Sequence, residues 1–195
     1  ALPICVASFS PFNNLCHYGQ MVNAGYVTYE QPIGDFTLLG GLRLEDEHLD
    51  LDQITQAVKV RHDRVNLFPT LHLGWRQSPT TQWTLNYSER IQRPGPGDLN
   101  PFRNLTDPFN IQAGNPDLLN QVTHSFEGAW NYRKGAKSYI ATLFYRQMDK
   151  GVTNVVTDLG GGVLLNRREN QASGKTAGLE LIAAGPLTKT IDYNV

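Results

Sequence analysis

Runs of alternating apolar and polar residues recur along this chain with a period of two. In the clearest run, Val65, Leu67, Leu71, Leu73 and Trp75 fall on one face of an extended segment, and the residues between them are mostly polar. This pattern predicts a β-strand that is apolar on one side only. Similar patterns predict strands at about 20–31, 36–45, 83–91, 125–132, 139–145 and 177–183, and the start of an eighth at 191–195.

The connections between these strands are alternately short and long. Pro, Gly and Ser mark tight turns near 32–35, 78–81, 133–137 and 185–188, whereas longer connections are predicted near 46–63, 92–121 and 149–174. In an antiparallel meander all the tight turns lie at one end, which is typical of outer-membrane barrels. Aromatic residues, which favour a membrane interface, lie beside these turns: Phe36, Trp75, Trp83, Trp130, Tyr132 and Tyr139.

A soluble β-sandwich is the alternative fold for the same alternation, with the apolar faces forming a core. Strands of about ten residues exceed the usual length in such a fold, which is about five or six. The sandwich also gives no reason for the aromatic band or for the difference between the two ends. The pattern therefore favours a membrane barrel.

Composition excludes some classes of protein. The chain has 195 residues, of which 40% are hydrophobic and 18% charged, and its net charge is -1. Such a chain lacks the basic field of a nucleic-acid-binding protein. No stretch approaches the ~18 consecutive apolar residues of a transmembrane helix, whereas a spanning β-strand needs only ~9–11 residues. The chain starts at Ala1 without a recognisable signal peptide, so we expect both ends to be cuts inside a longer protein.

Three motifs mark the longest connection and the strand before it. They are Tyr87-Ser88-Glu89-Arg90-Ile91-Gln92-Arg93-Pro94, Leu99-Asn100-Pro101-Phe102 and Gly114-Asn115-Pro116-Asp117-Leu118. In order and spacing they resemble the strand, loop and strand-entry signature of the barrel domain of TonB-dependent outer-membrane receptors. The chain departs from this family at Leu119-Asn120-Gln121, where Lys/Arg-Pro-Glu is usual. The resemblance extends from about Tyr18 to Tyr193.

The resemblance implies a bacterial outer-membrane receptor, not an enzyme, that binds a solute at the cell surface and imports it with energy delivered by TonB. Receptors of this family have a twenty-two-stranded barrel and an N-terminal plug, and the plug has no counterpart here. The implied partners are outer-membrane lipid and lipopolysaccharide, the TonB complex through the plug, and a small solute such as a siderophore, glycan, peptide or vitamin. No cofactor is implied. A small autonomous barrel acting as an adhesin or passive pore is the alternative.

We therefore predict an all-β fold. It is an antiparallel up-and-down transmembrane β-barrel segment of about seven to eight long strands, forming an open arc of a larger barrel. Residues 1–17 are expected to form an external loop or ragged start. Residues 18–195 are expected to form a partial barrel domain with a long external loop at about 92–121.

External loops on a rigid scaffold often carry binding residues. On location alone, the candidates for contact with a ligand are Arg103, Asn104, Asp107 and Phe109. Arg90, Arg93 and Arg103 could attract an anionic ligand, but charges in a barrel lumen are normally paired, so ion pairs with acidic residues of neighbouring strands are favoured. The motif residues expected to have structural roles are Arg90, Arg93, Pro94, Asn100, Pro101, Phe102, Gly114, Asn115 and Pro116.

Two sets of possible metal ligands carry no predicted site. Four acidic residues could offer oxygens to a hard cation, but they lack EF-hand spacing, so a charged run facing solvent or lipopolysaccharide is favoured. These residues are Asp46, Glu47, Asp50 and Asp52. Three histidines do not follow a zinc pattern: His48, His62 and His72.

Nucleophilic residues also carry no predicted catalytic site. An outer-membrane hydrolase would need a nucleophile and a base side by side, but Ser88 and Glu89 point to opposite faces of their strand. Cys5 and Cys16 could form a disulfide in an oxidising compartment or remain two thiols, and neither alternative is favoured.

Overall fold

The chain forms one long-stranded antiparallel sheet. The computed structural model describes residues 14–188 and 191–195 and the backbone of residues 4–6. In chain order the elements are β1 (Ile4–Val6), β2 (Leu15–Ile33), β3 (Phe36–Gln53), β4 (Val58–Ser78), β5 (Thr81–Gln92), α1 (Pro96–Leu99), β6 (Asn110–Ala113), β7 (Gln121–Lys134), β8 (Lys137–Gly160), β9 (Val163–Pro186) and β10 (Asp192–Asn194). Among the described residues, no helix has the length and apolar character needed to span a membrane.

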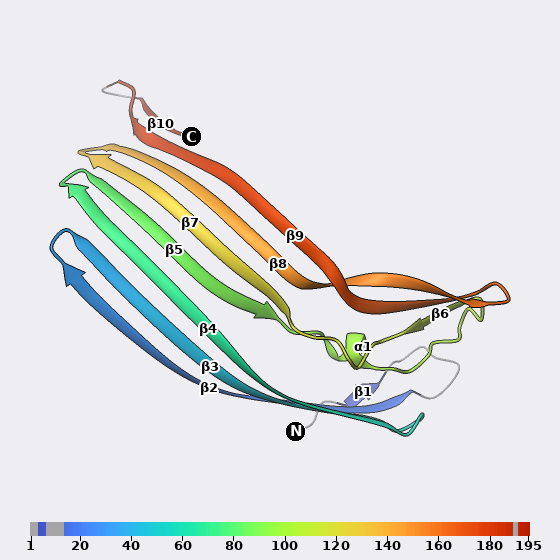
Figure 1. Cartoon of the computed structure of the whole chain (residues 1–195). Helices are drawn as coiled ribbons and strands as arrows, with labels where there is room; N and C mark the ends of the chain where they lie inside the picture. Colours follow the sequence, from blue (N-terminus) through green and yellow to red (C-terminus); the bar gives the residue numbers. More distant parts are fainter. Residues whose placement is uncertain (1–3, 7–13, 189–190) are drawn as a thin grey trace.

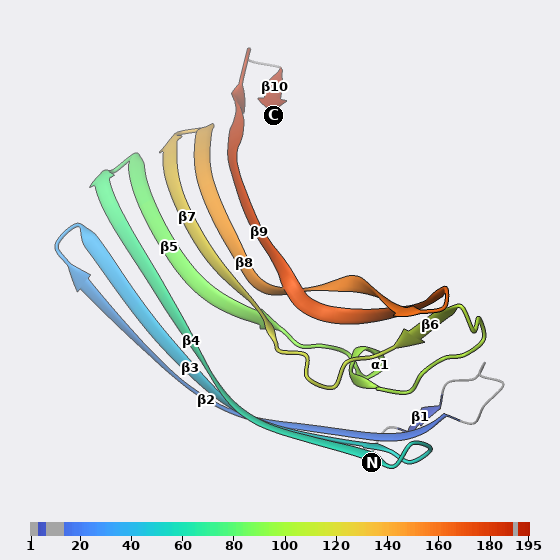
Figure 2. The ribbon, with the colours of Figure 1, turned by 45° about the vertical axis from the view of Figure 1, so that its right-hand side comes forward.

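The strands follow each other through the sheet in sequence order, apart from β6. The order is β1-β2-β3-β4-β5-β7-β8-β9-β10, and every neighbouring pair is antiparallel. In the described part of the chain, the two ends of this order do not pair with each other, so the sheet is a curved trough (Figures 1 and 2). The prediction of seven to eight long strands in an open arc is confirmed, because seven strands have 12 to 24 residues.

The register aligns aromatic side chains near one end of the sheet. Phe36 pairs with Trp75, Trp75 with Trp83, and Trp83 with Trp130. The rings of Phe36 and Trp75 stack with their centroids 5.8 Å apart. Because paired residues share a face, these side chains form a continuous aromatic band beside the short turns.

The two faces of the sheet differ in polarity. The connection between β5 and β7 lies inside the trough (Figure 2) and contacts Glu45 and Glu47, so these two side chains face the concave side. Leu42 and Leu44 precede them in β3 at positions of the opposite parity, so they face the convex side, and both are more than two fifths exposed. An exposed apolar convex face and a polar concave face are the arrangement of a barrel wall with lipid outside.

The strands β3 and β4 extend further than the sequence pattern predicts. A loop was expected from about residue 46 to Asp63, but the ladder continues from Leu44–Leu67 to Gln53–Val58 and only residues 54–57 turn. Past Leu44 the convex face becomes charged, with Asp46, His48, Asp50 and Asp52. The predicted loop was wrong because the alternation continues past Leu44, but the apolar residues move from the convex face to the concave face.

The strands β8 and β9 also continue beyond the membrane-facing part. The segment 149–174, predicted as one of the longer connections, consists of strand extensions that pair up to Gly160–Val163. The turn is made by Gly160, Gly161 and Gly162, which all have positive φ angles of 87°, 63° and 80°. Glycine adopts this left-handed backbone without the steric cost that other residues bear.

The start of the chain is only partly described. β2 begins at Leu15, within the segment 1–17 that was expected to be a loop or ragged start. Cys5 and Cys16 stand opposite each other in the β1–β2 ladder. The side chain of Cys5, on which the two sequence alternatives depend, lies outside the described residues.

Candidate functional site

The connection between β5 and β7, residues 93–120, is the candidate site; we call it the external loop. Its first turn is set by local chemistry, since Pro96 is the first residue of α1 and a proline fits there without losing a helical hydrogen bond. The carboxylate of Asp98 accepts a hydrogen bond from the amide of Gly95 at 3.2 Å. The helix ends before Pro101, because the residue preceding a proline disfavours helical geometry.

The two asparagine-proline motifs of the external loop lie side by side. The amide of Gly114 donates to the carbonyl of Asn100 at 2.8 Å, and the amide of Asn115 donates to the carbonyl of Asp98 at 2.6 Å. A Cβ atom on Gly114 would lie 2.7 Å from the Asp98 carbonyl oxygen and closer still to that of Asn100. Only glycine permits this approach, which explains the residue type at that place.

Asn115 ties the loop to β9. Its side chain is 4% exposed, and its Nδ2 donates to the carbonyl of Arg168 at 3.0 Å and to the carboxylate of Glu169 at 3.1 Å. Next to it, the backbone amide and carbonyl of Leu119 both bond the side chain of Asn170, at 2.7 and 3.0 Å. The short strand β6 adds a parallel ladder to β9. One side of the external loop is thus attached to β9.

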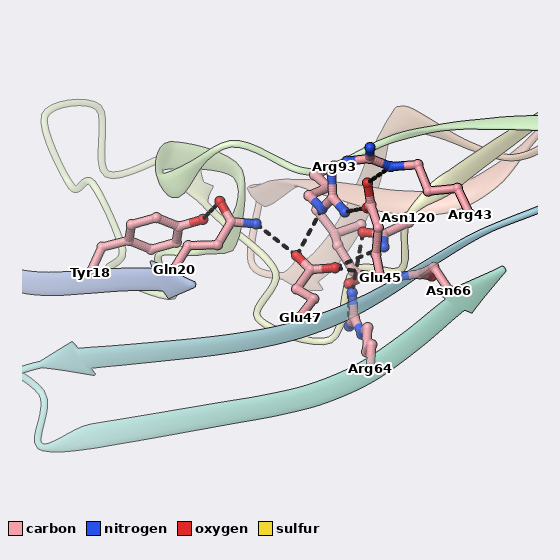
Figure 3. Close-up of polar contacts among 10 residues, drawn as sticks. Tyr18, Gln20, Arg43, Glu45, Glu47, Arg64, Asn66, Arg93 and Asn120 are labelled. Atoms are coloured by element: carbon pink, nitrogen blue, oxygen red, sulfur yellow. Dashed lines mark hydrogen bonds and ion pairs between the residues drawn. The ribbon is translucent and has the colours of Figure 1, made fainter. Parts of the chain in front are cut away.

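Arg93 ties the other side of the loop to β3. Its guanidinium bonds the Glu45 carboxylate, and its Nε lies 3.1 Å from Glu47 Oε1, although that N–H does not point at the oxygen (Figure 3). The Glu47 side chain is only 2% exposed. A carboxylate so far out of water needs both a counter-charge and hydrogen-bond donors to remain ionised.

Three amide side chains supply those donors, and the longest of the bonds runs from Asn66 Nδ2 to Glu47 Oε2 at 3.5 Å. Gln20 Nε2 donates to Glu47 Oε1 at 2.6 Å, and Asn120 Nδ2 donates to Glu47 Oε2 at 3.2 Å (Figure 3). Burial alone would raise the pKa of Glu47, but these hydrogen bonds, together with the charge of Arg93, bring its pKa below the ordinary value. Glu47 therefore stays charged and joins β2, β3 and both ends of the external loop.

Further contacts connect the loop to β4 and to an apolar cluster. His62 Nε2 lies 2.7 Å from the carbonyl oxygen of Pro116, and Arg64 donates to the carbonyl of Leu118 at 2.8 Å. Leu99 and Leu118, each at most 2% exposed, belong to the buried cluster on the concave face of β2 and β3. The other members of that cluster are Cys16, Tyr18, Leu49 and Leu51.

The four candidates for ligand contact lie on the external loop, but in different settings. The carboxylate of Asp107 caps its own turn, accepting from the amide of Phe109 at 2.9 Å and from Asn110 Nδ2 at 2.8 Å. Phe109 is 61% exposed, and Arg103 is exposed and forms no ion pair among the described residues. Asn104 bridges to Gln112 across the loop. Of the four, Asn104 also lines a cavity beside β9.

The arginines that were predicted to form ion pairs differ in their partners. Arg93 has the expected acidic partners on a strand of the concave face, and these partners, Glu45 and Glu47, were not predicted as site residues. Within the described chain, Arg90 makes no ion pair and lines a hollow of about 360 Å³ below the loop with Arg43 and Arg93. The sequence did contain a signal for these missed partners, because positions 45 and 47 carry two acidic residues on the same face of one strand.

The fold places the acidic residues of β3, and likewise Ser88 and Glu89, on opposite faces of the sheet. Asp46, Asp50 and Asp52 alternate with Glu47 along β3, so Glu47 lies on the opposite face, and no group of three possible ligands occurs in the described part of the chain. Ser88 pairs with Thr70 on the concave face, whereas Glu89 lies 3.5 Å from His124 on the other face.

The chain matches one family over most of its length. The model of the outer membrane protein beta-barrel family matches residues 8–195. A comparison with curated proteins finds no match.

Several solved structures share the arc. The FrpB iron transporter from Neisseria meningitidis (F3-3 variant) is 19% identical, with a TM-score of 0.64 over 88% of this chain and 24% of that one. The siderophore receptor PirA from Pseudomonas aeruginosa is 14% identical, with a TM-score of 0.62 over 93% of this chain and 42% of that one. The Serratia marcescens hemophore receptor HasR, a double mutant in complex with its hemophore HasA and heme, is 16% identical, with a TM-score of 0.65 over 88% and 32%. The chain thus spans a quarter to two fifths of the length of these structures.

Proposed function

The chain belongs to the outer membrane protein beta-barrel family and lies in the bacterial outer membrane, and we propose that it forms part of the barrel of a TonB-dependent receptor. In this proposal residues 18–195 are a section of the wall, and the protein binds a solute at the cell surface and imports it across the outer membrane. The similar solved structures are transporters and receptors. The three motifs that resemble the family all belong to β5 or the external loop.

One observation carries this proposal: the external loop is folded into the trough and attached on both sides of it. It reaches β3 through Arg93 and β9 through Asn115. A loop held in this way narrows the external mouth and presents polar groups there, as binding at the cell surface requires. The polar concave face below it would line the path of import.

A small closed barrel acting as an adhesin or passive pore is less well supported. Its seven long strands would have to close on themselves, but among the described strands β2 and β9 are not neighbours. Lipid and lipopolysaccharide would contact the convex face, and TonB would act through a plug domain outside this chain.

The proposal is tested by what the bacterium removes from its medium. A strain carrying the intact protein and a matched deletion strain are grown in complex medium, with and without a protonophore, and the remaining solutes are measured by mass spectrometry. We expect at least one solute to be depleted only by energised cells that carry the protein. Equal depletion by both strains, or depletion that persists with the protonophore, would contradict energised import.

A further inference from the structure

A second cavity lies between the external loop and β9, apart from the ion pairs of Arg93. It has a volume of about 530 Å³, within the range of small-molecule sites. Six amide side chains line it: Asn14, Asn100, Asn104, Gln112, Asn154 and Asn166. They come from the residue before β2, from the loop and from the extended β8–β9 hairpin, so segments distant in the sequence converge there (Figure 1).

Three of these amides have no partner within the described part of the chain. Asn100 is 7% exposed, and its side chain is already engaged: its Oδ1 accepts from the amide of Phe102 and its Nδ2 donates to Asn14 Oδ1. It therefore helps to hold the shape of the cavity. In contrast, no hydrogen bond of the described residues engages the side chains of Gln112, Asn154 or Asn166. Gln112 and Asn166 are also aligned in the parallel β6–β9 ladder. Each free amide offers donors and an acceptor to a ligand.

The charge of the cavity is balanced. Its two charged residues are Asp98 and Arg168, and Arg168 Nε lies 3.0 Å from Asp98 Oδ1. An anionic ligand would have to compete with Asp98 for Arg168, and a cationic ligand would have to compete with Arg168 for Asp98. The lining therefore favours a neutral, strongly hydrogen-bonding ligand.

One apolar surface completes the lining. Among the described residues that line the cavity, Phe102 is the only aromatic one, and its backbone amide donates to Asn100 Oδ1 at 3.1 Å. A half-exposed ring beside several amides can cover the C–H face of a ligand while the amides bond its edge. Hydroxyl groups both donate and accept, which matches amides that do the same.

We propose that this cavity binds a neutral oligosaccharide. This inference rests on the proposed function, since it takes the loop end to face the outside of the cell, and it names the class of solute. Gln112, Asn154 and Asn166 would bond hydroxyl groups, and Phe102 would stack on a sugar ring. The sugar could be a free solute or the outer part of lipopolysaccharide. Its position on the concave side favours a free solute, because lipid lies against the convex face.

The test measures binding to the intact outer-membrane protein, purified in detergent. A glycan array identifies bound neutral oligosaccharides, and the core oligosaccharide of lipopolysaccharide, a random peptide library and ferric enterobactin are measured in parallel. The variant Asn154→Ala/Asn166→Ala removes two free amides without removing an internal hydrogen bond. Asn23→Ala, an exposed asparagine on the convex face of β2, is the matched control.

We expect a neutral oligosaccharide to bind and the double variant to weaken that binding by about tenfold or more, since two hydrogen bonds are lost. The control should stay within about twofold of the unmodified protein. Binding of only peptide, ferric enterobactin or lipopolysaccharide core, absence of any bound glycan, or equal affinity in the double variant would overturn the proposal. If the oligosaccharide binds as expected but no energised uptake is found, the site stands and the import function fails.

Discussion

The ion pairs of Arg93 lead to a quantitative prediction about the external loop. Replacing Arg93 by Ala leaves Glu47, which is 2% exposed, without a cation, whereas Glu45 keeps its ion pair with Arg43 at 2.7 Å. Removing one partner of such a buried pair typically costs about 3–5 kcal/mol. The substitution destabilises the attached state of the loop relative to the detached state, because the detached state exposes both carboxylates to water.

Hydrogen exchange measures this loss where it occurs. The amides of residues 115–120 should exchange roughly 100-fold to several thousand-fold faster in Arg93→Ala, up to the limit set by full opening of the loop. The strands in the membrane-facing part should keep their protection. Arg93→Lys should lie in between, because an ammonium group keeps the charge but lacks the planar fork of donors with which a guanidinium bonds carboxylates.

A substitution in the same loop controls for unspecific effects. Arg103 is exposed and has no ion pair in the described chain, so Arg103→Ala should leave exchange at 115–120 unchanged. Heat-dependent mobility in detergent gels should confirm that both variants retain a folded barrel. If exchange at 115–120 in Arg93→Ala stays within twofold of the unmodified protein, the ion pairs do not hold the loop and the reasoning is refuted.

Three further outcomes follow from the structure. Gly114→Ala should destabilise the attached loop by about 1–3 kcal/mol, measured by the same exchange experiment, because its Cβ overlaps the preceding turn. Hydrogen bonds to Asp63 and Asp46 raise the pKa of His48, so histidine NMR should give a pKa above about 6.5 that falls in Asp63→Asn, and the stability from this contact should be lost as pH rises through that pKa. With both native cysteines replaced, a bulky impermeant maleimide should label Leu105→Cys in intact cells but should label Ala136→Cys, in a short turn, only after the outer membrane is opened.

The membrane-facing wall was predictable because its pattern is local. Strand alternation has a period of two, so the sequence alone shows that Leu67, Leu71 and Leu73 share a face. The tight turns then fix which strands are neighbours. These two facts are enough to align Trp75 with Trp83, as the ladder shows.

The external end was not predictable by the same means. Beyond Leu44 the convex side of β3 is charged, whereas Leu49 and Leu51 on the concave side are covered by the external loop. A strand that exchanges the polarity of its faces looks irregular in a single sequence, so a loop was expected. The reason for the exchange is the loop itself, which supplies the apolar cover.

The candidate site depended on contacts between distant segments. Glu45 and Arg93 are 48 residues apart in sequence, and no spacing rule joins them. Location alone suggested four residues as ligand contacts, and they remain untested candidates: Arg103, Asn104, Asp107 and Phe109. The amides of the second cavity come from three segments, and only their frequency in the external connections could have indicated them.

The two attachments of the external loop differ in strength. On β3 the loop is held by a buried ion pair, whereas on β9 it is held by amide hydrogen bonds and by the half-exposed pair of Arg168 and Asp98. Exposed pairs contribute about 0–1 kcal/mol, well below the cost of breaking a buried pair, so loss of the Arg168–Asp98 pair should loosen the loop less than loss of the Arg93 pairs. A ligand in the amide-lined cavity contacts both the loop and β9. Binding there would therefore add contacts between the loop and β9 and stabilise the attached loop.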